Sequence, residues 1–161
     1  MRVLQMAVVA ALTLGFISTA PLGHSSAWGA NFSSIKGAWR GAGQLKLQDG
    51  KTERLRCKAY YNPKDGGSKL GMAVRCASTS YKFEFRSQLS LKGEKIYGSW
   101  EERNFNAEGE VAGKFSPGNI TLKATGAVEA GMFVKYTSNQ QTVSMVGNFG
   151  NFRGIKLSLK K

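Results

Sequence analysis

Few side chains in this sequence could do covalent chemistry, and the cysteines come first. Cys57 and Cys76 are the only two cysteines, and His24 is the only histidine. The cysteines lack the Cys-x-x-Cys spacing of redox proteins, and a thiol for redox or acyl-transfer chemistry would need an activating partner. They fall on the apolar faces of two neighbouring predicted strands, around a turn near Asp65. The sequence therefore predicts a disulfide in an oxidising compartment, and a reactive thiol is the alternative.

The carboxylates offer little acid–base chemistry. Asp49 and Asp65 each precede a glycine, where an aspartate supports the turn itself. Glu101 and Glu102 are adjacent, so on a strand they face opposite sides and cannot form a pair in one cleft. We expect Glu102 at a solvated strand end. The alternative is that it lies inside the rim of a β-barrel, should the strands form one. Since no Gly-rich phosphate loop or metal-ligand cluster is present, the sequence predicts no enzyme, no catalytic residue, no metal and no cofactor.

The N-terminal segment 1–27 has the features of a secretory signal peptide. Arg2 precedes an apolar run over 6–17, and small residues follow as far as Ala27. The run is too short for an ordinary membrane span, although a retained anchor is the alternative. Cleavage after Ala27 would remove His24, which excludes a Ser-His-Asp triad, a Cys–His pair and His-bound zinc or haem. We expect one domain over 28–161, located in the periplasm or secreted.

The rest of the chain alternates apolar and polar residues with period two. The clearest run covers 81–91, and turn sequences such as Asp-Gly, Lys-Gly and the Glu-Gly at 108–109 separate the runs. Because all connections are short, neighbouring strands should be antiparallel. The pattern predicts an all-β fold, a single antiparallel up-and-down β-barrel of about 8–10 strands, with a β-sandwich as the alternative. The expected strands are Gly37–Leu47, 54–61, 70–76, 81–91, 95–103, 110–115, Asn119–Gly126, 132–137, 141–147 and 153–159.

Glycines beside aromatic residues favour the barrel. Gly37 stands two residues before Trp39, and Gly98 two residues before Trp100. A glycine on the apolar face permits the bend that closes a sheet. The segment 35–41, Ile-Lys-Gly-Ala-Trp-Arg-Gly, resembles the Gly-x-Trp opening of lipocalin-like (calycin) barrels, which implies that Trp39 closes the barrel floor.

Two further resemblances concern the same chain. The Trp-Arg-Gly-Ala-Gly stretch at 39–43 is similar to nitrobindin-type barrels, but their haem-ligating histidine has no counterpart here. The later lipocalin motifs and the C-terminal helix are also missing. The whole mature chain, including Arg56-Cys57 and Arg75-Cys76, resembles an uncharacterised family of small exported alphaproteobacterial proteins. That resemblance implies a periplasmic location and no known activity.

An outer-membrane barrel is a further alternative, because alternation alone does not say which face meets lipid. The polar face carries too many Lys and Arg residues to pack inside a narrow barrel. Cys57, Cys76 and several glycines would lie on the lipid face, and no pair of aromatic girdles marks the strand ends. The sequence therefore favours a barrel that does not span a membrane.

The formal net charge of +13 points to an anionic partner or to a solvated surface. If Cys57 pairs with Cys76, Lys58 stands opposite Arg75, and like charges so placed lower stability. Glu84 interrupts the basic face, and another pairing would set it against Arg75. Because the chain is predicted to be exported, we expect no nucleic acid partner but an anionic lipid, lipopolysaccharide or acidic polysaccharide of the envelope. The predicted anion-binding surface comprises Arg54, Arg56, Lys58, Lys69, Arg75, Lys82 and Arg86.

The aromatic interior is the second candidate site. If the barrel is tightly filled, the inward-facing aromatic side chains are part of the hydrophobic core. If the barrel is wider, they line a cavity for a small apolar ligand. The sequence thus predicts an exported, non-catalytic binding protein, with an envelope interaction protein that uses its basic face as the alternative. The candidate cavity residues are Trp39, Phe83, Phe85, Trp100 and Phe115.

Overall fold

The computed structural model describes residues 30–161, apart from the side chains of residues 148 and 149. The predicted signal peptide, 1–27, and His24 within it lie outside the described residues, as does the start of the predicted domain at residue 28. No helix among the described residues is both long and apolar enough to cross a membrane.

The described chain is almost entirely strand. Two short 3-10 turns, η1 and η2, are the helical pieces in this part of the chain. The elements in chain order are η1 (Ser33–Ile35), β1 (Gly37–Leu47), β2 (Thr52–Lys64), η2 (Asp65–Gly67), β3 (Lys69–Ala77), β4 (Lys82–Lys92), β5 (Lys95–Glu102), β6 (Ala107–Ser116), β7 (Asn119–Gly126), β8 (Glu129–Tyr136), β9 (Gln140–Phe149) and β10 (Phe152–Lys160).

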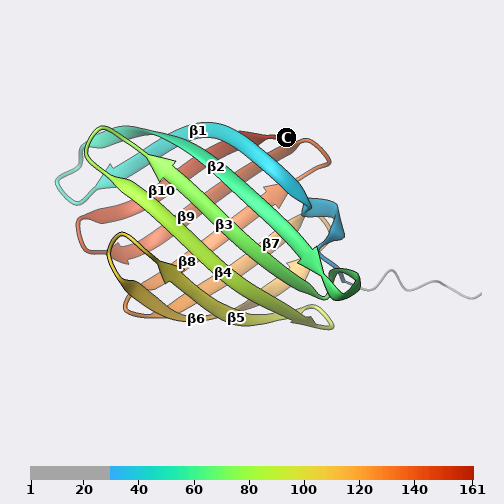
Figure 1. Ribbon diagram of the computed structural model, residues 1–161. Helices are drawn as coiled ribbons and strands as arrows, with labels where there is room; N and C mark the ends of the chain where they lie inside the picture. The colour runs from blue at the N-terminus through green and yellow to red at the C-terminus, as the bar shows by residue number, and fades with distance from the viewer. Residues whose placement is uncertain (1–29) are drawn as a thin grey trace, which may run out of the picture.

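The ten strands form one closed, antiparallel, up-and-down barrel (Figure 1). Each strand pairs with its neighbours in sequence, and β1 pairs with β10 to close the sheet, with Arg40 opposite Lys160. Closure leaves no unpaired sheet edge. The predicted all-β, calycin-like barrel is confirmed, and the β-sandwich alternative is wrong because one continuous sheet joins back on itself.

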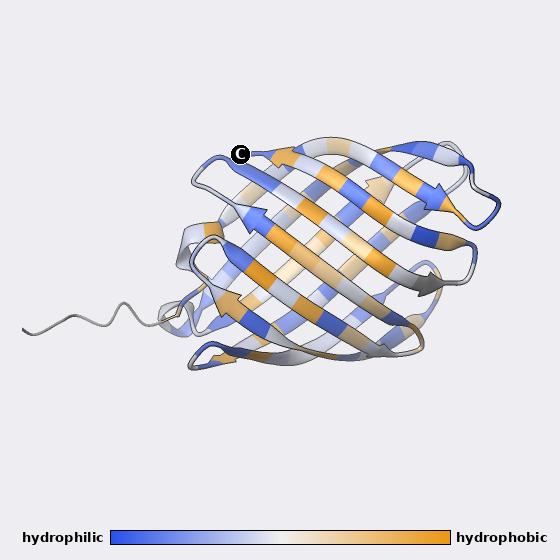
Figure 2. Cartoon of the chain, turned by 180° about the vertical axis from the view of Figure 1, so that it is seen from behind, coloured by the Kyte–Doolittle hydropathy of each residue, from blue (hydrophilic) through white to orange (hydrophobic). Residues whose placement is uncertain are grey.

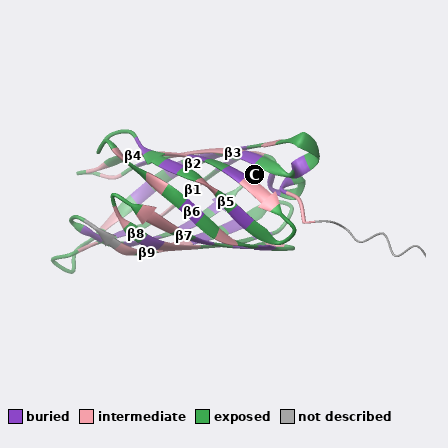
Figure 3. Cartoon of the chain, turned by 90° about the horizontal axis from the view of Figure 1, so that it is seen from below, coloured by how far each residue is buried: buried purple, intermediate pink, exposed green. Residues whose placement is uncertain are grey.

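Period-two alternation decides which side chains face inward. On β2, Leu55, Cys57, Ala59 and Tyr61 are buried, while the residues between them are exposed. Hydrophobic and hydrophilic residues alternate along the strands in Figure 2, and buried and exposed residues alternate in Figure 3. The interior of the barrel is therefore the hydrophobic core, as period two requires of a sheet with one wet face.

The predicted bounds of β1 and β7 agree with the structure, but the start of β6 was predicted wrongly. The Glu-Gly pair at 108–109 lies inside β6 and does not make the turn. The turn covers 103–106 and uses Asn106, which has a positive φ of 49°. A Cβ at Gly109 would collide with the carbonyl oxygen of Thr125 and lie 2.9 Å from Trp100 Nε1. Glycine at this position therefore lets β6 lie close to β7 and to the Trp100 ring, and it does not mark a turn.

Candidate ligand cavity

One end of the barrel is closed by the segment that precedes β1. η1 lies at this end, where the chain first joins the barrel (Figure 1). Phe32 and Ile35 are fully buried, and the Phe32 amide donates to the carbonyl oxygen of Gly67 at 2.8 Å. Trp39 is also fully buried, and its Nε1 donates to the carbonyl oxygen of Ile35 at 2.9 Å. Trp39 thus stands in the floor of the barrel.

Phe115 belongs to the same floor. Its ring meets Phe32 edge to face with centroids 5.7 Å apart, while Trp39 meets Tyr61 in a similar way at 6.5 Å. Edge-to-face contacts of this kind are favourable beyond the apolar area that they bury. Of the five candidate cavity residues, Trp39 and Phe115 therefore pack as core at the closed end.

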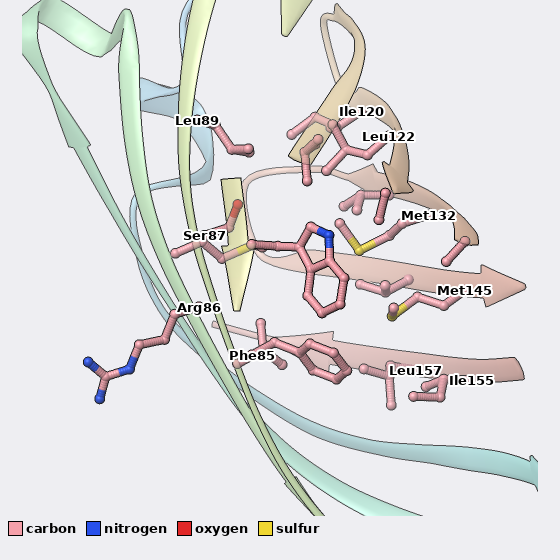
Figure 4. Close-up of a pocket in the computed structure, with 18 of the residues that line it drawn as sticks. Phe85, Arg86, Ser87, Leu89, Ile120, Leu122, Met132, Met145, Ile155 and Leu157 are labelled. Atoms are coloured by element: carbon pink, nitrogen blue, oxygen red, sulfur yellow. The ribbon is translucent and has the colours of Figure 1, made fainter. Parts of the chain in front are cut away.

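Above this floor lies an inner cavity of about 90 Å³. Its wall is made almost wholly of aliphatic, thioether and aromatic groups. Phe85, Met132, Met145 and Leu157 point into the space, whereas the guanidinium of Arg86 points away from it (Figure 4). Methionine side chains can adjust to fit ligands of differing shape, since they are unbranched and flexible. The cavity is thus an apolar space with partly adaptable walls.

A second, wider cavity of about 360 Å³ lies toward the opposite end and is called here the mouth cavity. Phe85, Trp100, Met145 and Ile155 line both cavities, so the two spaces adjoin. The volume of the mouth cavity is in the range of small-molecule sites. Of the candidate cavity residues, Phe83, Phe85 and Trp100 line it.

Aromatic rings gather around the mouth. Phe83 and Phe85 stack with centroids 6.1 Å apart, and Phe83 also meets Phe152 at 5.0 Å. Phe105, in the turn between β5 and β6, is 52% exposed and lies 5.9 Å from the Phe83 ring. Phe105, Phe152 and Tyr81 are contributed by turns or by strand ends. Alternation over 81–91 placed Tyr81 on the inner face, but Phe105 and Phe152 lie outside the expected strands, where alternation gives no information.

Glu102 stands at the mouth but is bonded to the protein. It is 3% exposed, so the expectation of a solvated strand end was wrong. Its Oε1 accepts from the Glu84 amide at 2.6 Å and its Oε2 from the Phe105 amide at 2.7 Å, with Asn104 Nδ2 at 3.3 Å from Oε1. These amide groups satisfy the carboxylate oxygens and offset the cost of burying them. The residue fastens the β5–β6 turn to β4.

On the inner wall, Ser87 and Tyr61 are likewise hydrogen-bonded within the protein, whereas Gln141 Nε2 has no hydrogen-bond partner among the described residues. Ser87 donates from its hydroxyl to the carbonyl oxygen of Ser99 at 2.6 Å. Tyr61 donates to Gln141 Oε1 at 3.0 Å, and burial raises the pKa of Tyr61 to about 12 despite this hydrogen bond. Among the described residues, no group of three His, Cys, Asp or Glu side chains is placed to hold a metal ion.

The predicted disulfide is present. Cys57 and Cys76 face each other on β2 and β3 and are joined, with 19 residues of separation in sequence. Their pairing also sets Lys58 opposite Arg75, as predicted. A disulfide is typical of proteins that leave the cytoplasm.

On the outer wall, most of the predicted basic residues gather in one place. Arg54, Arg56, Lys58, Arg75 and Lys82 line a shallow hollow of about 640 Å³ on β1 to β4. Arg40 of β1 lines it too. The sequence interpretation missed this residue because it assigned no residue-by-residue pairing between β1 and β2.

Two predicted members of this surface lie elsewhere or are neutralised. Lys69 is at the other end of β3, where its Nζ lies 2.7 Å from Asp65 Oδ2 and holds the pKa of that carboxyl below its usual value. Arg86 pairs with Glu84, Nη2 to Oε1 2.7 Å, and this hydrogen bond lowers the pKa of Glu84. The alternating pattern placed both cations on the outer face. It also placed Glu84 in that face, and the pairing that sets Glu84 against Arg75 is present together with the pairing of Lys58 and Arg75. It gave no information on the ion pair between Lys69 and Asp65.

Comparison with known proteins identifies the fold. No protein-family model matches the chain, and no curated protein matches it in sequence. The barrel is similar to Rv2717c from M. tuberculosis, with a TM-score of 0.63 and 11% identity over 80% of this chain and 92% of that one. It is also similar to the S-type phycobiliprotein lyase CPES from Guillardia theta, with a TM-score of 0.50 and 14% identity over 80% and 87% of the two chains. The chain therefore shares a lipocalin-like β-barrel with these structures.

Proposed function

We propose that this chain is an exported, non-catalytic binding protein of the bacterial envelope that holds a small apolar ligand inside its barrel. The observation that carries the proposal is the apolar inner cavity and the mouth cavity that adjoins it, about 90 and about 360 Å³. A ligand seated there would bury its apolar surface against Phe85, Trp100 and Met145, and such burial supplies most of the affinity in sites of this kind.

The state of the polar groups supports binding over catalysis. One structural neighbour is named as a lyase, so a reaction inside the barrel is the rival hypothesis. Tyr61, Ser87 and Glu102 each use their oxygen atoms in hydrogen bonds within the protein. A general acid or base must instead have a proton or lone pair directed at the substrate. The two cavities therefore offer a ligand mainly shape complementarity and apolar contact.

The location is supported by separate observations. The predicted signal peptide, the Cys57–Cys76 disulfide and the resemblance to small exported proteins all favour a compartment outside the cytoplasm. Native mass spectrometry of the protein purified from its own periplasm should show an added mass that is lost on denaturation.

The binding proposal is tested with a neutral fluorescent probe, N-phenyl-1-naphthylamine, which avoids any contribution from the basic surface. Ala107 lines the mouth cavity, which is large enough for the probe, so Ala107→Phe should fill part of it and weaken probe binding by about tenfold or more. Ala112 is exposed on the outer wall, and Ala112→Phe adds the same group outside. This matched control should bind the probe as the wild type does. Equal binding by Ala107→Phe and the wild type, or no binding by the wild type, would contradict the proposal.

A further inference from the structure

The outer wall carries a second candidate site that does not depend on the barrel cavity. Six basic side chains line the hollow on β1 to β4 and are called here the cationic hollow: Arg40, Arg54, Arg56, Lys58, Arg75 and Lys82. All six residues are exposed. The hollow measures about 640 Å³, enough for a ligand rather than a single small ion.

Strand pairing sets these cations against one another. Arg40 lies opposite Lys58, and Lys58 lies opposite Arg75, so three cations form a row across β1, β2 and β3. Lys160 extends the row onto β10 as the partner of Arg40. With strands about 4.8 Å apart, the row of four spans about 14 Å. Like charges directly opposite each other destabilise a sheet, so the row is a local stress that a bound anion would relieve.

Acidic residues in the described chain do little to neutralise the row. Glu84 faces Arg75 at 3.4 Å, but the same oxygen lies 2.7 Å from Arg86 Nη2 and 3.8 Å from Arg103 Nη1. One carboxylate is thus shared among three guanidinium groups. Within residues 30–161, the other five cations of the hollow have no carboxylate within ion-pair distance. The positive charge of the cationic hollow is therefore available to bind an anionic ligand.

Small side chains at the middle of the hollow give it depth. Arg56 stands between Ala42 on β1 and Ala77 on β3, its directly opposite residues. Alanine at these two positions leaves space between the longer cationic side chains around it. An anionic group can thus approach from several sides at once, as multidentate recognition requires.

We propose that the cationic hollow binds a ligand that carries two or more phosphate groups. Arginine forks match phosphate oxygens in two-point hydrogen bonds, and four of the six cations are arginines. The length of the row suits separated phosphates better than one ion. Phosphates of this kind occur on lipid headgroups and on soluble polyphosphorylated molecules, and the experiment below separates these sources.

The test measures thermal unfolding in pyrophosphate, in inorganic phosphate and in chloride at equal ionic strength. Pyrophosphate should raise the Tm of the wild type by about 3–6 °C over chloride, because it binds the folded state and bridges opposed cations. Inorganic phosphate should give a smaller rise. An equal rise with both anions would overturn the assignment of a ligand with several phosphates, and no rise would overturn the site itself.

Variants of Lys58 separate a site from general charge screening. Lys58→Gln and Lys58→Glu should each abolish the pyrophosphate shift, yet both should unfold in chloride at or above the wild-type Tm because repulsion in the row is relieved. Lys135 is exposed on β8, outside the hollow, and Lys135→Gln should keep the full shift. A shift that survives both Lys58 variants, or one lost equally in Lys135→Gln, would overturn the proposal.

Co-sedimentation with vesicles identifies the source of the phosphates. Retention by vesicles that contain cardiolipin, whose headgroup carries two phosphates, supports a lipid headgroup if pyrophosphate displaces the protein and vesicles of phosphatidylcholine alone do not retain it. A Tm shift in pyrophosphate without vesicle retention supports a soluble ligand. Vesicle retention that pyrophosphate does not displace and Lys58→Glu does not weaken would overturn the proposed site.

Discussion

At the scale of single residues, Tyr61 shows how burial shapes chemistry in this barrel. Its hydroxyl donates to Gln141 Oε1, and among the described residues Gln141 Nε2 has no hydrogen-bond partner. Such a deeply placed polar pair is costly when one partner is removed, since the other loses both water and its bond. Sequence alternation placed Tyr61 on the inner face, but its partner lies 80 residues away and no local pattern connects them.

The raised pKa of Tyr61 makes stability fall at alkaline pH. In the unfolded chain a tyrosine ionises near pH 10, whereas in the fold Tyr61 keeps its proton until about 12. Between these values the unfolded state binds fewer protons, so the free energy of unfolding declines by up to about 1.4 kcal/mol per pH unit. Tyr61→Phe should show a shallower decline in urea unfolding between pH 10 and pH 11. Tyr60→Phe, at an exposed neighbour, should keep the wild-type slope.

At the scale of elements, strand pairing followed from the sequence more fully than turn positions did. Alternation of Leu55, Cys57 and Ala59 with cations fixed which face of β2 is buried, because a shift of one residue would expose that whole set. The turn predicted at Glu108-Gly109 was wrong, because a glycine permits both a turn and the close approach of two strands. Telling the two apart requires the neighbouring strand, where Thr125 and Trp100 leave no room for a Cβ.

The disulfide between β2 and β3 should contribute measurably to stability. It closes a loop with a sequence separation of 19, for which chain entropy predicts about 3 kcal/mol. The double variant Cys57→Ala/Cys76→Ala should lose about that much free energy of unfolding and keep a β-rich far-ultraviolet spectrum. Non-reducing mass spectrometry of the mature wild type should detect no free thiol. Two free thiols would contradict the disulfide.

At the scale of the whole molecule, the barrel is closed at one end and hollow toward the other. The five aromatic residues predicted to face inward divide accordingly, with Trp39 and Phe115 in the floor and Phe83 at the mouth. The sequence could not make this division, because the space inside a barrel depends on strand tilt and shear, which alternation does not specify. The Gly-x-Trp resemblance did imply the position of Trp39.

A barrel closed at one end should admit its ligand through the mouth. Phe105 is 52% exposed, and its ring packs against Phe83 and Phe152 over that cavity. Phe105→Ala should therefore speed both association and release of the neutral probe by about tenfold in stopped-flow fluorescence. Phe133→Ala, at a 49% exposed phenylalanine of the outer wall, is the matched control and should leave both rates unchanged. Unchanged rates in Phe105→Ala would indicate another route of access.

The seam between β1 and β10 has a consequence for the connectivity of the polypeptide. Arg40 lies opposite Lys160, so the first and last strands of the barrel meet side by side. A linker from residue 161 to residue 30 would make the backbone cyclic while preserving all ten strand pairings and the η1 segment that closes the floor. New termini could then be opened at an exposed tip such as Gly50, giving a circular permutant whose covalent start lies at the mouth. The architecture thus depends on which strands are neighbours, and the place where the chain begins is interchangeable.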